Sequence, residues 1–277
     1  MSERFDVDAG DGLRLHVAAS GNGPALVLLH GFTGSSETWN FLRPSLDSHY
    51  RIVAVDLPGH GRSSSPSDPG RYSLERFAAD LATVLDTLEI ERAAVLGYSM
   101  GGRAALRFAI ARPDRTSALV LESTSPGISD AGEREERAAG DRELADFIER
   151  EGIAAFVSRW EGLPLWESQR ALPDTSRKTL RDQRLSNNPR GLANSLRGAG
   201  AGGGLDVLDK VRSLTAPALI LAGELDTRYV ELGRRLARAI PGAELEIVAG
   251  CGHAAHLERP EAFTTAVADF LARIGAA

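Results

Sequence analysis

The sequence predicts an α/β fold in which a mostly parallel, doubly wound sheet carries an inserted helical cap. Three observations lead to this prediction. Short apolar runs, typical of strands buried on both faces, alternate with helical patterns along most of the chain. A charged stretch between residues 124 and 210 interrupts this alternation once. A glycine-flanked serine, Ser99, stands between one apolar run and the helix that follows it.

The expected elements follow from these patterns in chain order. Phe5–Asp8 and Arg14–Ala18 predict a hairpin, because the Asp11-Gly12 dipeptide between them is a strong turn signal. Buried strands are expected at Ala25–Leu29, Ile52–Val55, Ala93–Leu96, Ala118–Leu121 and Ala218–Leu221, and a last strand is expected at Leu245–Val248. Helices are expected at Ser73–Leu88, Met100–Ala111, Val230–Ala239 and Pro260–Ile274. Alternation of this kind indicates βαβ units and a parallel sheet.

The stretch 124–210 is rich in charge and poor in β-branched runs. We therefore expect it to form a helical cap, inserted into a core made of residues 1–123 and 211–277. Helical segments of the cap are expected around Gly132–Glu151 and Ile153–Trp160.

Composition places the chain among ordinary soluble proteins, with 277 residues, 43% hydrophobic and 25% charged. The formal net charge of −6 does not favour binding to nucleic acid or to an anionic membrane. A single cysteine, Cys251, excludes an intrachain disulfide and is compatible with a reducing compartment. Met1–Asp6 lacks the pattern of a signal peptide, and no apolar stretch approaches membrane-spanning length. We therefore expect a cytoplasmic protein without membrane insertion.

Ser99 lies in Gly97-Tyr98-Ser99-Met100-Gly101, after an expected strand and before an expected helix. This context indicates a nucleophile elbow, a sharp turn that needs small residues two before and two after the serine. The turn exposes the serine hydroxyl at the sheet edge, where the helix start supplies backbone N–H groups and a positive dipole end. The pattern is that of the α/β-hydrolase fold.

A serine hydroxyl is a weak base and nucleophile at neutral pH, so it needs a histidine and an acid that orients the histidine. In this fold the chain order is serine, acid, histidine. His253 follows the last expected strand and Asp226 the strand before it, which predicts a Ser99–His253–Asp226 triad. Glu122 and Glu224, which also follow expected strands, remain alternatives for the acid.

The segment His30-Gly31-Phe32-Thr33-Gly34 follows the first buried strand and resembles an H-G-x-x-G oxyanion loop. The backbone N–H groups of Phe32 and Met100 are therefore expected to form an oxyanion hole. His253 and His256 are spaced i, i+3, but no cysteine or carboxylate pattern completes a metal-ligand set. No glycine fingerprint for phosphate follows the first strand. We expect neither a metal nor an organic cofactor.

Further segments, including parts of the cap, resemble one family over most of the chain. These segments are Gly97–Arg103, Leu121–Gly127, Glu133–Asp141, Phe156–Trp160, Leu163–Trp166, Arg184–Pro189, Ser195–Gly198, Gly223–Asp226 and Gly252–Glu258. Together they resemble the 2-succinyl-6-hydroxy-2,4-cyclohexadiene-1-carboxylate synthases, lyases of menaquinone biosynthesis. That family eliminates pyruvate from 2-succinyl-5-enolpyruvyl-6-hydroxy-3-cyclohexene-1-carboxylate.

The resemblance implies a small anionic partner, because the family's substrate carries three carboxylates, and guanidinium groups bind carboxylates bidentately. By resemblance, Arg103, Arg137 and Arg184 match the family's substrate-binding arginines, and Tyr98 and Trp160 match positions that line the site. The sequence does not indicate an oligomeric state.

Arg103 has a separate argument from spacing. It lies four residues after Ser99, on the same helix face one turn further on, so its side chain is expected near the pocket floor. Arg134 is a close alternative to Arg137 as the cap arginine that contacts substrate.

The chain departs from the family pattern in two places. Gly198–Gly204 stands where a Gly-x-Gly-x-Gln-Pro-like segment is expected, and Arg228-Tyr229 stands where Lys-Phe is expected. Within the first departure, Ala199–Gly204 is a candidate hinge or a plain flexible loop, because glycine restricts the backbone little.

The resemblance implies that the triad abstracts a proton. Ser99, activated by His253, would remove the proton α to the succinyl ketone, and pyruvate would leave as its enol without an acyl-enzyme. The alternative is a serine carboxylesterase or C–C bond hydrolase in which Ser99 is a true nucleophile. A binding protein of the same fold is a third possibility, which the complete triad disfavours.

Overall fold

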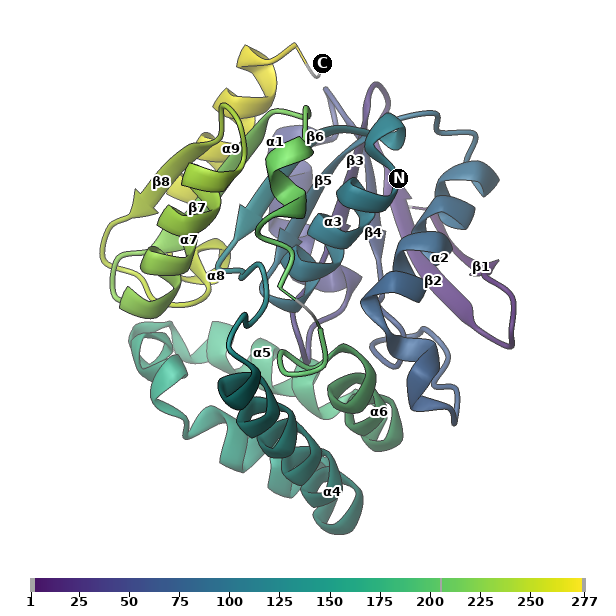
Figure 1. The fold of residues 1–277 in the computed structure, drawn as a ribbon, viewed down its shortest axis with the longest axis vertical. Coiled ribbons are helices and arrows are strands. Elements are labelled where there is room, and N and C mark those ends of the chain that lie inside the picture. Colours follow the sequence, from purple (N-terminus) through teal and green to yellow (C-terminus); the bar gives the residue numbers. More distant parts are fainter. Residues whose placement is uncertain (1–2, 205, 276–277) are drawn as a thin grey trace.

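The computed structural model describes residues 3–204 and 206–275, in which eight strands form one sheet in the order β1-β2-β4-β3-β5-β6-β7-β8. The strands are β1 (Glu3–Asp8), β2 (Arg14–Ser20), β3 (Ala25–Leu29), β4 (Arg51–Val55), β5 (Ala93–Tyr98), β6 (Thr116–Glu122), β7 (Ala218–Gly223) and β8 (Glu244–Val248). β2 runs antiparallel to β1 and β4, and the other neighbours are parallel. The helices of the core flank this sheet, and the cap helices lie together beyond one end of it (Figure 1).

Helices cover both faces of the sheet. They are α1 (Arg43–Leu46), α2 (Leu74–Thr87), α3 (Met100–Ala111), α7 (Thr227–Ala239), α8 (Ala255–Glu258) and α9 (Pro260–Arg273). Alternate strand residues belong to different cores. Val27 belongs to the core that includes side chains of α2, α3 and α7, whereas Leu28 belongs to the core that includes side chains of α1 and α9. Both faces of β3 are therefore buried, which is why its sequence is continuously apolar.

The expected hairpin and all the other expected strands are present, with ends extended by at most two residues. The expected fold is thereby confirmed. Helix α2 begins after Ser73, whose hydroxyl caps it by accepting from the Arg76 N–H. Helix α7 begins at Thr227 rather than at the expected Val230, because the Asp226 side chain caps its first turn.

The cap is the helical insertion between β6 and β7. It comprises α4 (Ala131–Glu161), the 3₁₀ segment η4 (Pro164–Ala171), α5 (Asp174–Leu185) and α6 (Pro189–Ala199). Gly152 breaks α4 with φ 81° and ψ 173°, so the two expected helical segments are separate. The sequence did not indicate α5 and α6. The division into a core of 1–123 and 211–277 and a cap of 124–210 stays a prediction.

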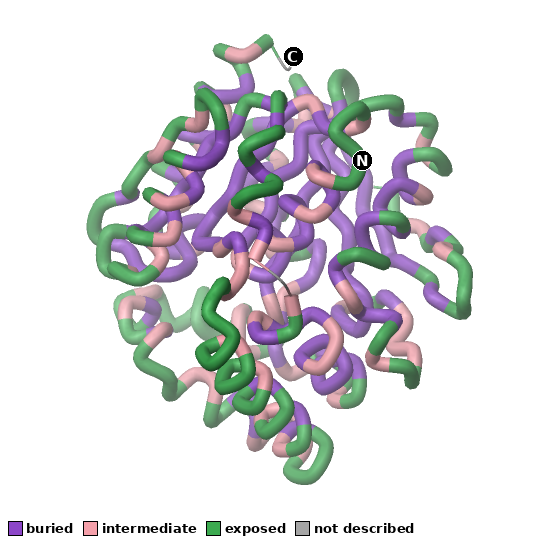
Figure 2. The backbone as a smooth tube through the Cα atoms, viewed as in Figure 1, coloured by how far each residue is buried: buried purple, intermediate pink, exposed green. Residues whose placement is uncertain are grey.

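The cap has a small core of its own, in which Ile148 and Phe156 of α4 pack against Leu192 and Leu196 of α6. The central strands are buried, whereas the edge strands β1 and β8 and much of α4 are exposed (Figure 2). Within the described part of the chain, no helix combines the length and apolarity needed to cross a membrane. Met1 and Ser2, which open the segment examined for a signal peptide, lie outside the described residues.

Candidate active site

Ser99 sits on a strained turn between β5 and α3, with φ 50° and ψ −108°. The glycines on either side of the turn are required because neighbouring backbone atoms lie too close to leave room for a Cβ. A Cβ on Gly97 would lie 2.3 Å from the Gly101 carbonyl oxygen, and a Cβ on Gly101 would lie 2.2 Å from the Leu29 carbonyl oxygen. The expected strand–turn–helix geometry is therefore present, and it holds Ser99 at the carboxyl edge of the sheet.

The side chains expected to form the triad are hydrogen-bonded to one another. His253 Nε2 lies 3.1 Å from Ser99 Oγ, and His253 Nδ1 lies 2.6 Å from Asp226 Oδ2. The Asp226 Oδ1 atom accepts from the Tyr229 N–H at 3.3 Å, so the start of α7 fixes the carboxylate. The imidazole is 2% exposed, and the rings of Tyr229 and Trp166 enclose it at centroid distances of 4.4 and 5.6 Å.

The alternative acids have other partners. Glu122 is fully buried and binds the His256 ring, with Oε2 2.8 Å from Nδ1. Glu224 accepts from the Gly250 backbone N–H at 2.9 Å. Of the three candidate acids, Asp226 is the one that contacts His253.

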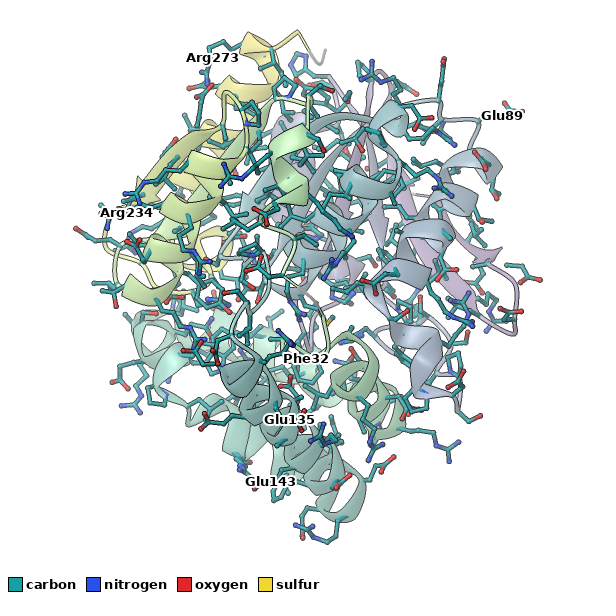
Figure 3. The ribbon with its side chains drawn as sticks, viewed as in Figure 1. Phe32, Glu89, Glu135, Glu143, Arg234 and Arg273 are labelled. Atoms are coloured by element: carbon teal, nitrogen blue, oxygen red, sulfur yellow. The ribbon has the colours of Figure 1, made fainter. Side chains whose placement is uncertain are left out.

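A cavity of about 360 Å³ lies over Ser99, between the core and the cap. Its lining brings together most of the expected site residues: Phe32, Tyr98, Ser99, Met100, Arg103, Arg137, Trp160 and His253. Figure 3 shows Phe32 at the junction of the two parts, where it packs against both the sheet core and the cap core. The Trp160 ring meets Phe32 edge-on at 5.4 Å.

The loop that carries Phe32 is held in place by a neutral histidine. Burial lowers the pKa of His30 to about 4, so the ring is uncharged at neutral pH. Its Nδ1–H donates to the Gly31 carbonyl at 2.7 Å, and its Nε2 accepts from the Leu57 N–H at 2.9 Å. Gly31 packs against Tyr98, whose ring a Cβ at Gly31 would approach to 2.6 Å. The loop after β3 is thus fixed beside the nucleophile turn.

Arg103 lines the cavity from the end of the first turn of α3. Its Nη1 donates to the Gly200 carbonyl at 3.0 Å. Burial lowers the pKa of the guanidinium to about 10, which leaves it protonated at neutral pH. A protonated group that has lost much of its hydration gains strongly from an anionic ligand.

Arg137 reaches the same cavity from α4. Its Nε donates to Asp141 Oδ1 at 2.9 Å, and Asp141 Oδ2 accepts from the Gly202 N–H at 3.1 Å. Arg134, the close alternative, instead donates to the backbone carbonyls of Ile128 and Ser129. Of these two arginines, Arg137 therefore lines the cavity over Ser99.

The glycine-rich segment considered as a hinge or flexible loop packs against α4. A Cβ on Gly200 would lie 2.5 Å from Asp141 Oδ2, and a Cβ on Gly202 would lie 2.2 Å from the Ala138 backbone nitrogen. At both positions, the absence of a Cβ allows the segment to lie this close to its neighbours. The segment therefore contacts the surroundings of both cavity arginines. Its Gly200 carbonyl accepts from Arg103, and its Gly202 N–H donates to Asp141, which also accepts from Arg137.

We expect Gly202→Ala to destabilise the protein, because the new methyl group would clash with the α4 backbone. Overpacking of this kind costs about 1–3 kcal/mol, and each kcal/mol lowers Tm by about 2–4 °C in a chain of this size. Gly203→Ala is the matched control, because its nearest neighbour would lie at 3.6 Å. Thermal melting checks both variants. Equal Tm values would show that the segment does not pack as described.

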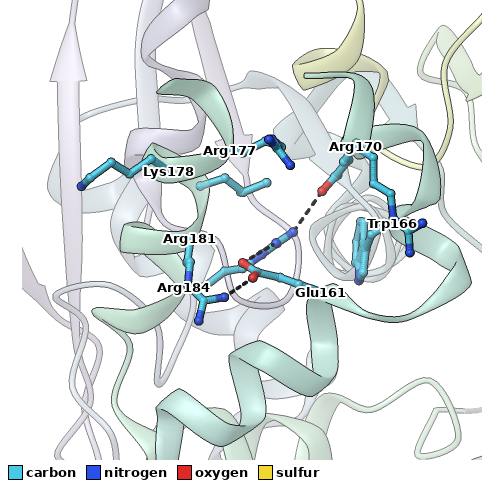
Figure 4. Close-up of a pocket in the computed structure, with 9 residues that line it drawn as sticks. Glu161, Trp166, Arg170, Arg177, Lys178, Arg181 and Arg184 are labelled. Carbon is cyan, nitrogen blue, oxygen red and sulfur yellow. Dashed lines mark hydrogen bonds and ion pairs between the residues drawn. The ribbon is translucent and has the colours of Figure 1, made fainter. Parts of the chain in front are cut away.

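Arg184, which the family resemblance matches to a substrate-binding arginine, lies beside the cavity over Ser99, in a smaller cavity that it shares with Phe32, Tyr98 and Trp166. It is 5% exposed on α5, with Nη1 3.1 Å from Glu161 Oε1 and Nη2 3.2 Å from Gln169 Oε1. Its guanidinium stacks over the Trp166 ring at 5.3 Å. Arg184 also lines a further cavity in the cap, whose wall includes Glu161 and Trp166 (Figure 4).

Three residues of the site were not assigned a role from the sequence. Tyr229 and Trp166 enclose the imidazole, and the Thr124 hydroxyl donates to the Ser99 carbonyl at 2.8 Å. For two of them, the position in the sequence could have indicated a place near the site: Thr124 follows the end of β6, and Tyr229 lies three residues after Asp226. Among residues 3–204 and 206–275, no group of three or more His, Cys, Asp or Glu side chains could hold a metal ion.

Comparison with known proteins agrees with this geometry. The family described as alpha/beta hydrolase fold matches residues 24–260. The putative 2-succinyl-6-hydroxy-2,4-cyclohexadiene-1-carboxylate synthase of Bacillus subtilis (strain 168) is 42% identical, over 97% of this chain and 98% of that protein. The structure of MenH from S. aureus is 33% identical with a TM-score of 0.89, over 96% of this chain and 100% of that one.

A thermophilic esterase from Thermogutta terrifontis, with malate bound, is also similar. It is 28% identical with a TM-score of 0.86, and 99% of each chain is covered. The first two proteins cover a similar share of this chain but are more identical to it than this esterase is. The chain therefore belongs to the α/β-hydrolase family and, within it, to the family of 2-succinyl-6-hydroxy-2,4-cyclohexadiene-1-carboxylate synthases.

Proposed function

We propose that this protein is a lyase of menaquinone biosynthesis that eliminates pyruvate from 2-succinyl-5-enolpyruvyl-6-hydroxy-3-cyclohexene-1-carboxylate. The product is 2-succinyl-6-hydroxy-2,4-cyclohexadiene-1-carboxylate, after which the similar Bacillus protein is named. The observation that carries the proposal is the hydrogen-bonded set of Ser99, His253 and Asp226 beneath a cavity that also contains Arg103 and Arg137. We place the reaction in the cytoplasm.

The triad acts as a base in this proposal. Asp226 accepts from His253 Nδ1–H, so the Nε2 atom is free to accept the Ser99 hydroxyl proton. The Ser99 oxygen takes the proton α to the succinyl ketone as its own proton passes to His253. The electron pair left on carbon forms an enolate and then expels the enolpyruvyl oxygen, so that the C–O bond breaks. His253 returns its proton to the departing oxygen, so pyruvate leaves as its enol, the triad regains its starting protonation, and Ser99 forms no covalent bond to substrate.

Negative charge develops on the ketone oxygen during this step. We assign its stabilisation to the backbone N–H groups of Phe32 and Met100, because both residues line the cavity beside Ser99. Met100 opens α3, where the backbone N–H groups have no partner within the helix. A positioned base contributes about 10²–10⁴-fold to the rate, so the oxyanion hole must supply a substantial further share.

Arg103 and Arg137 are the proposed ligands of the substrate carboxylates, and Tyr98 and Trp160 form part of the apolar wall that orients the ring. No step requires a metal ion or an organic cofactor. By resemblance, Arg184 is a third proposed ligand of the substrate carboxylates, and Glu161 and Gln169 hold it beside this cavity.

A second candidate is a serine carboxylesterase or C–C bond hydrolase. It is favoured by the same Ser99–His253 hydrogen bond, which would equally activate a nucleophile, and by the similarity to the Thermogutta esterase. A hydrolase should give a burst of acyl-enzyme with an activated ester. The lyase proposal predicts no comparable burst.

The proposal is tested by supplying the enolpyruvyl substrate, generated in situ by upstream enzymes, and following pyruvate release. We expect release at a rate proportional to protein concentration, and an unchanged rate with a chelator present. Pyruvate release equal to that of the uncatalysed background would overturn the proposed function. Loss of activity with the chelator and recovery with added metal would overturn the cofactor-free mechanism.

A further inference from the structure

The loop that carries His253 lies between β8 and α8 and contains two glycines, Gly250 and Gly252. The imidazole at its end has to meet Ser99 Oγ at 3.1 Å and Asp226 Oδ2 at 2.6 Å at the same time. Glycine restricts the backbone little, so the loop does not fix this position by its own conformational preferences. A displacement of about 1 Å can cost about 10²-fold in rate. The position of His253 therefore depends on what the loop contacts.

Glu258 binds the backbone on both sides of His253. Its Oε2 accepts from the Gly252 N–H at 2.7 Å, and its Oε1 accepts from the Ala254 N–H at 3.4 Å. Glu258 is the last residue of α8, and its buried carboxylate turns back toward the loop that precedes this helix. Hydrogen bonds to a charged acceptor are stronger than those between neutral groups, and a buried setting strengthens them further. One carboxylate thus holds the two neighbours of the catalytic histidine.

Glu122 holds the same loop from the end of β6. Its Oε1 accepts from the His256 backbone N–H at 3.0 Å, and its Oε2 lies 2.8 Å from His256 Nδ1, which carries its proton beside the carboxylate. The His256 ring also packs against the rings of Tyr98 and Trp39, at centroid distances of 4.5 and 5.1 Å. Glu122 and His256 are 0% and 1% exposed. The start of α8, three residues beyond His253, is therefore fixed to the sheet.

Glu122 is also bonded to the nucleophile turn. Its carbonyl accepts from the Ser99 N–H at 2.8 Å, and two residues later the Thr124 hydroxyl donates to the Ser99 carbonyl. The Ser99 backbone has a positive φ, a conformation that persists only where the surroundings fix it. Through its backbone and its side chain, Glu122 therefore connects the turn that carries Ser99 to the segment that carries His253.

We propose that Glu122 and Glu258 are positioning residues, which hold the His253 loop against the Ser99 turn so that one imidazole reaches both Ser99 and Asp226. Neither carboxylate belongs to the described lining of the cavity over Ser99, so both act through the loop and not on substrate. This inference rests on the proposed catalytic role of the triad, but not on which bond of the substrate is cleaved.

Two variants of Glu258 test the contact that brackets His253. Glu258→Gln keeps one acceptor oxygen and turns an amide group toward the other N–H, so we expect kcat to fall about tenfold. Glu258→Ala removes both acceptors and should lower kcat about 100-fold. KM should stay within about twofold, because the arginines of the cavity are untouched. A raised KM at unchanged kcat, or a lowered Tm at unchanged kcat, would overturn the positioning role.

Glu122→Gln tests the second contact. The amide can still accept from the His256 N–H, but its NH₂ group would face the ring Nδ1–H, so we expect kcat to fall about tenfold at nearly unchanged KM. Both glutamine variants preserve side-chain size, so the test does not depend on whether Glu258→Ala folds.

Glu224→Gln is the matched control. Glu224 also accepts a backbone N–H of this loop, that of Gly250 at 2.9 Å, but Gly250 does not adjoin His253. We expect its kcat to be unchanged. Equal losses in Glu224→Gln and Glu258→Gln would show that any change in the loop has the same effect, and the proposal would fall.

Proton NMR supplies a measurement that needs no substrate. The Nδ1 proton of His253 is shared with Asp226 and shielded from solvent, so it should resonate downfield of the amide protons, and its loss in His253→Ala identifies it. We expect this signal to shift or broaden in Glu258→Gln and Glu122→Gln and to stay in place in Glu224→Gln. An unchanged signal in both of the first two variants would overturn the proposal. Absence of pyruvate release by the unaltered protein would instead refute the proposed function alone.

Discussion

Replacement of Ser99 or His253 by alanine is expected to abolish most pyruvate release while leaving the fold intact. Both side chains lie at the cavity floor, and neither belongs to the apolar cores. A positioned base contributes about 10²–10⁴-fold, so each variant should lose at least that factor in kcat. Steady-state rates and thermal melting, measured on the same preparations, check the two parts of this prediction.

The losses should not add. Ser99 transfers its proton to His253, so the Ser99→Ala/His253→Ala variant should be about as slow as either single variant. Asp226→Asn should also lose most activity, because the amide cannot hold the imidazole in the required tautomer. Near-full activity in Asp226→Asn, combined with inactivity of Glu122→Gln, would contradict the assignment of the acid.

Arg103→Ala is expected to raise KM and lower kcat for the proposed tricarboxylate substrate. The guanidinium is fixed one helical turn beyond Ser99 by its bond to the Gly200 carbonyl, so it would both anchor and orient a carboxylate. A hydrogen bond to a charged group contributes roughly 1.5–3 kcal/mol, which corresponds to a loss of about 10- to 150-fold in kcat/KM. Arg103→Lys keeps the charge but not the planar fork, so it should recover part of this loss.

A neutral substrate provides the control for Arg103. If the protein hydrolyses a small neutral ester at all, Arg103→Ala should leave that rate nearly unchanged, because the ester has no carboxylate to bind. The comparison therefore uses two substrates on one variant. Equal losses on both would mean that Arg103 supports the nucleophile turn structurally, and its assignment to substrate would be wrong.

The sheet and the triad were accessible from the sequence because both depend on local patterns. A buried parallel strand such as Ala25–Leu29 must be apolar on both faces, so it appears as a continuous run. The Ser99 turn needs glycine at fixed positions, because the backbones of neighbouring segments approach within contact distance. The order of serine, acid and histidine then left few candidates, and hydrogen bonding distinguishes Asp226 from Glu122 and Glu224.

The cap was less accessible because its geometry depends on packing between distant segments. Helix α5 carries mostly charged and polar residues, so no apolar periodicity marked it. Where the Arg184 side chain lies relative to Trp166 depends on how α5 packs against the rest of the cap. Local sequence patterns do not specify that packing. Gly202 appeared as a freely rotating loop residue, whereas its role is to let the chain pass against Ala138.

Single-turnover pyruvate release from substrate carrying hydrogen or deuterium at the carbon α to the succinyl ketone tests the central claim most directly. The single-turnover format removes product release from the measured rate. If removal of that proton by Ser99, activated by His253, is the slow step that precedes C–O cleavage, pyruvate is released and deuterium slows its release. Absence of pyruvate, or identical rates for the two substrates, would contradict the claim that this triad acts as the base of an elimination.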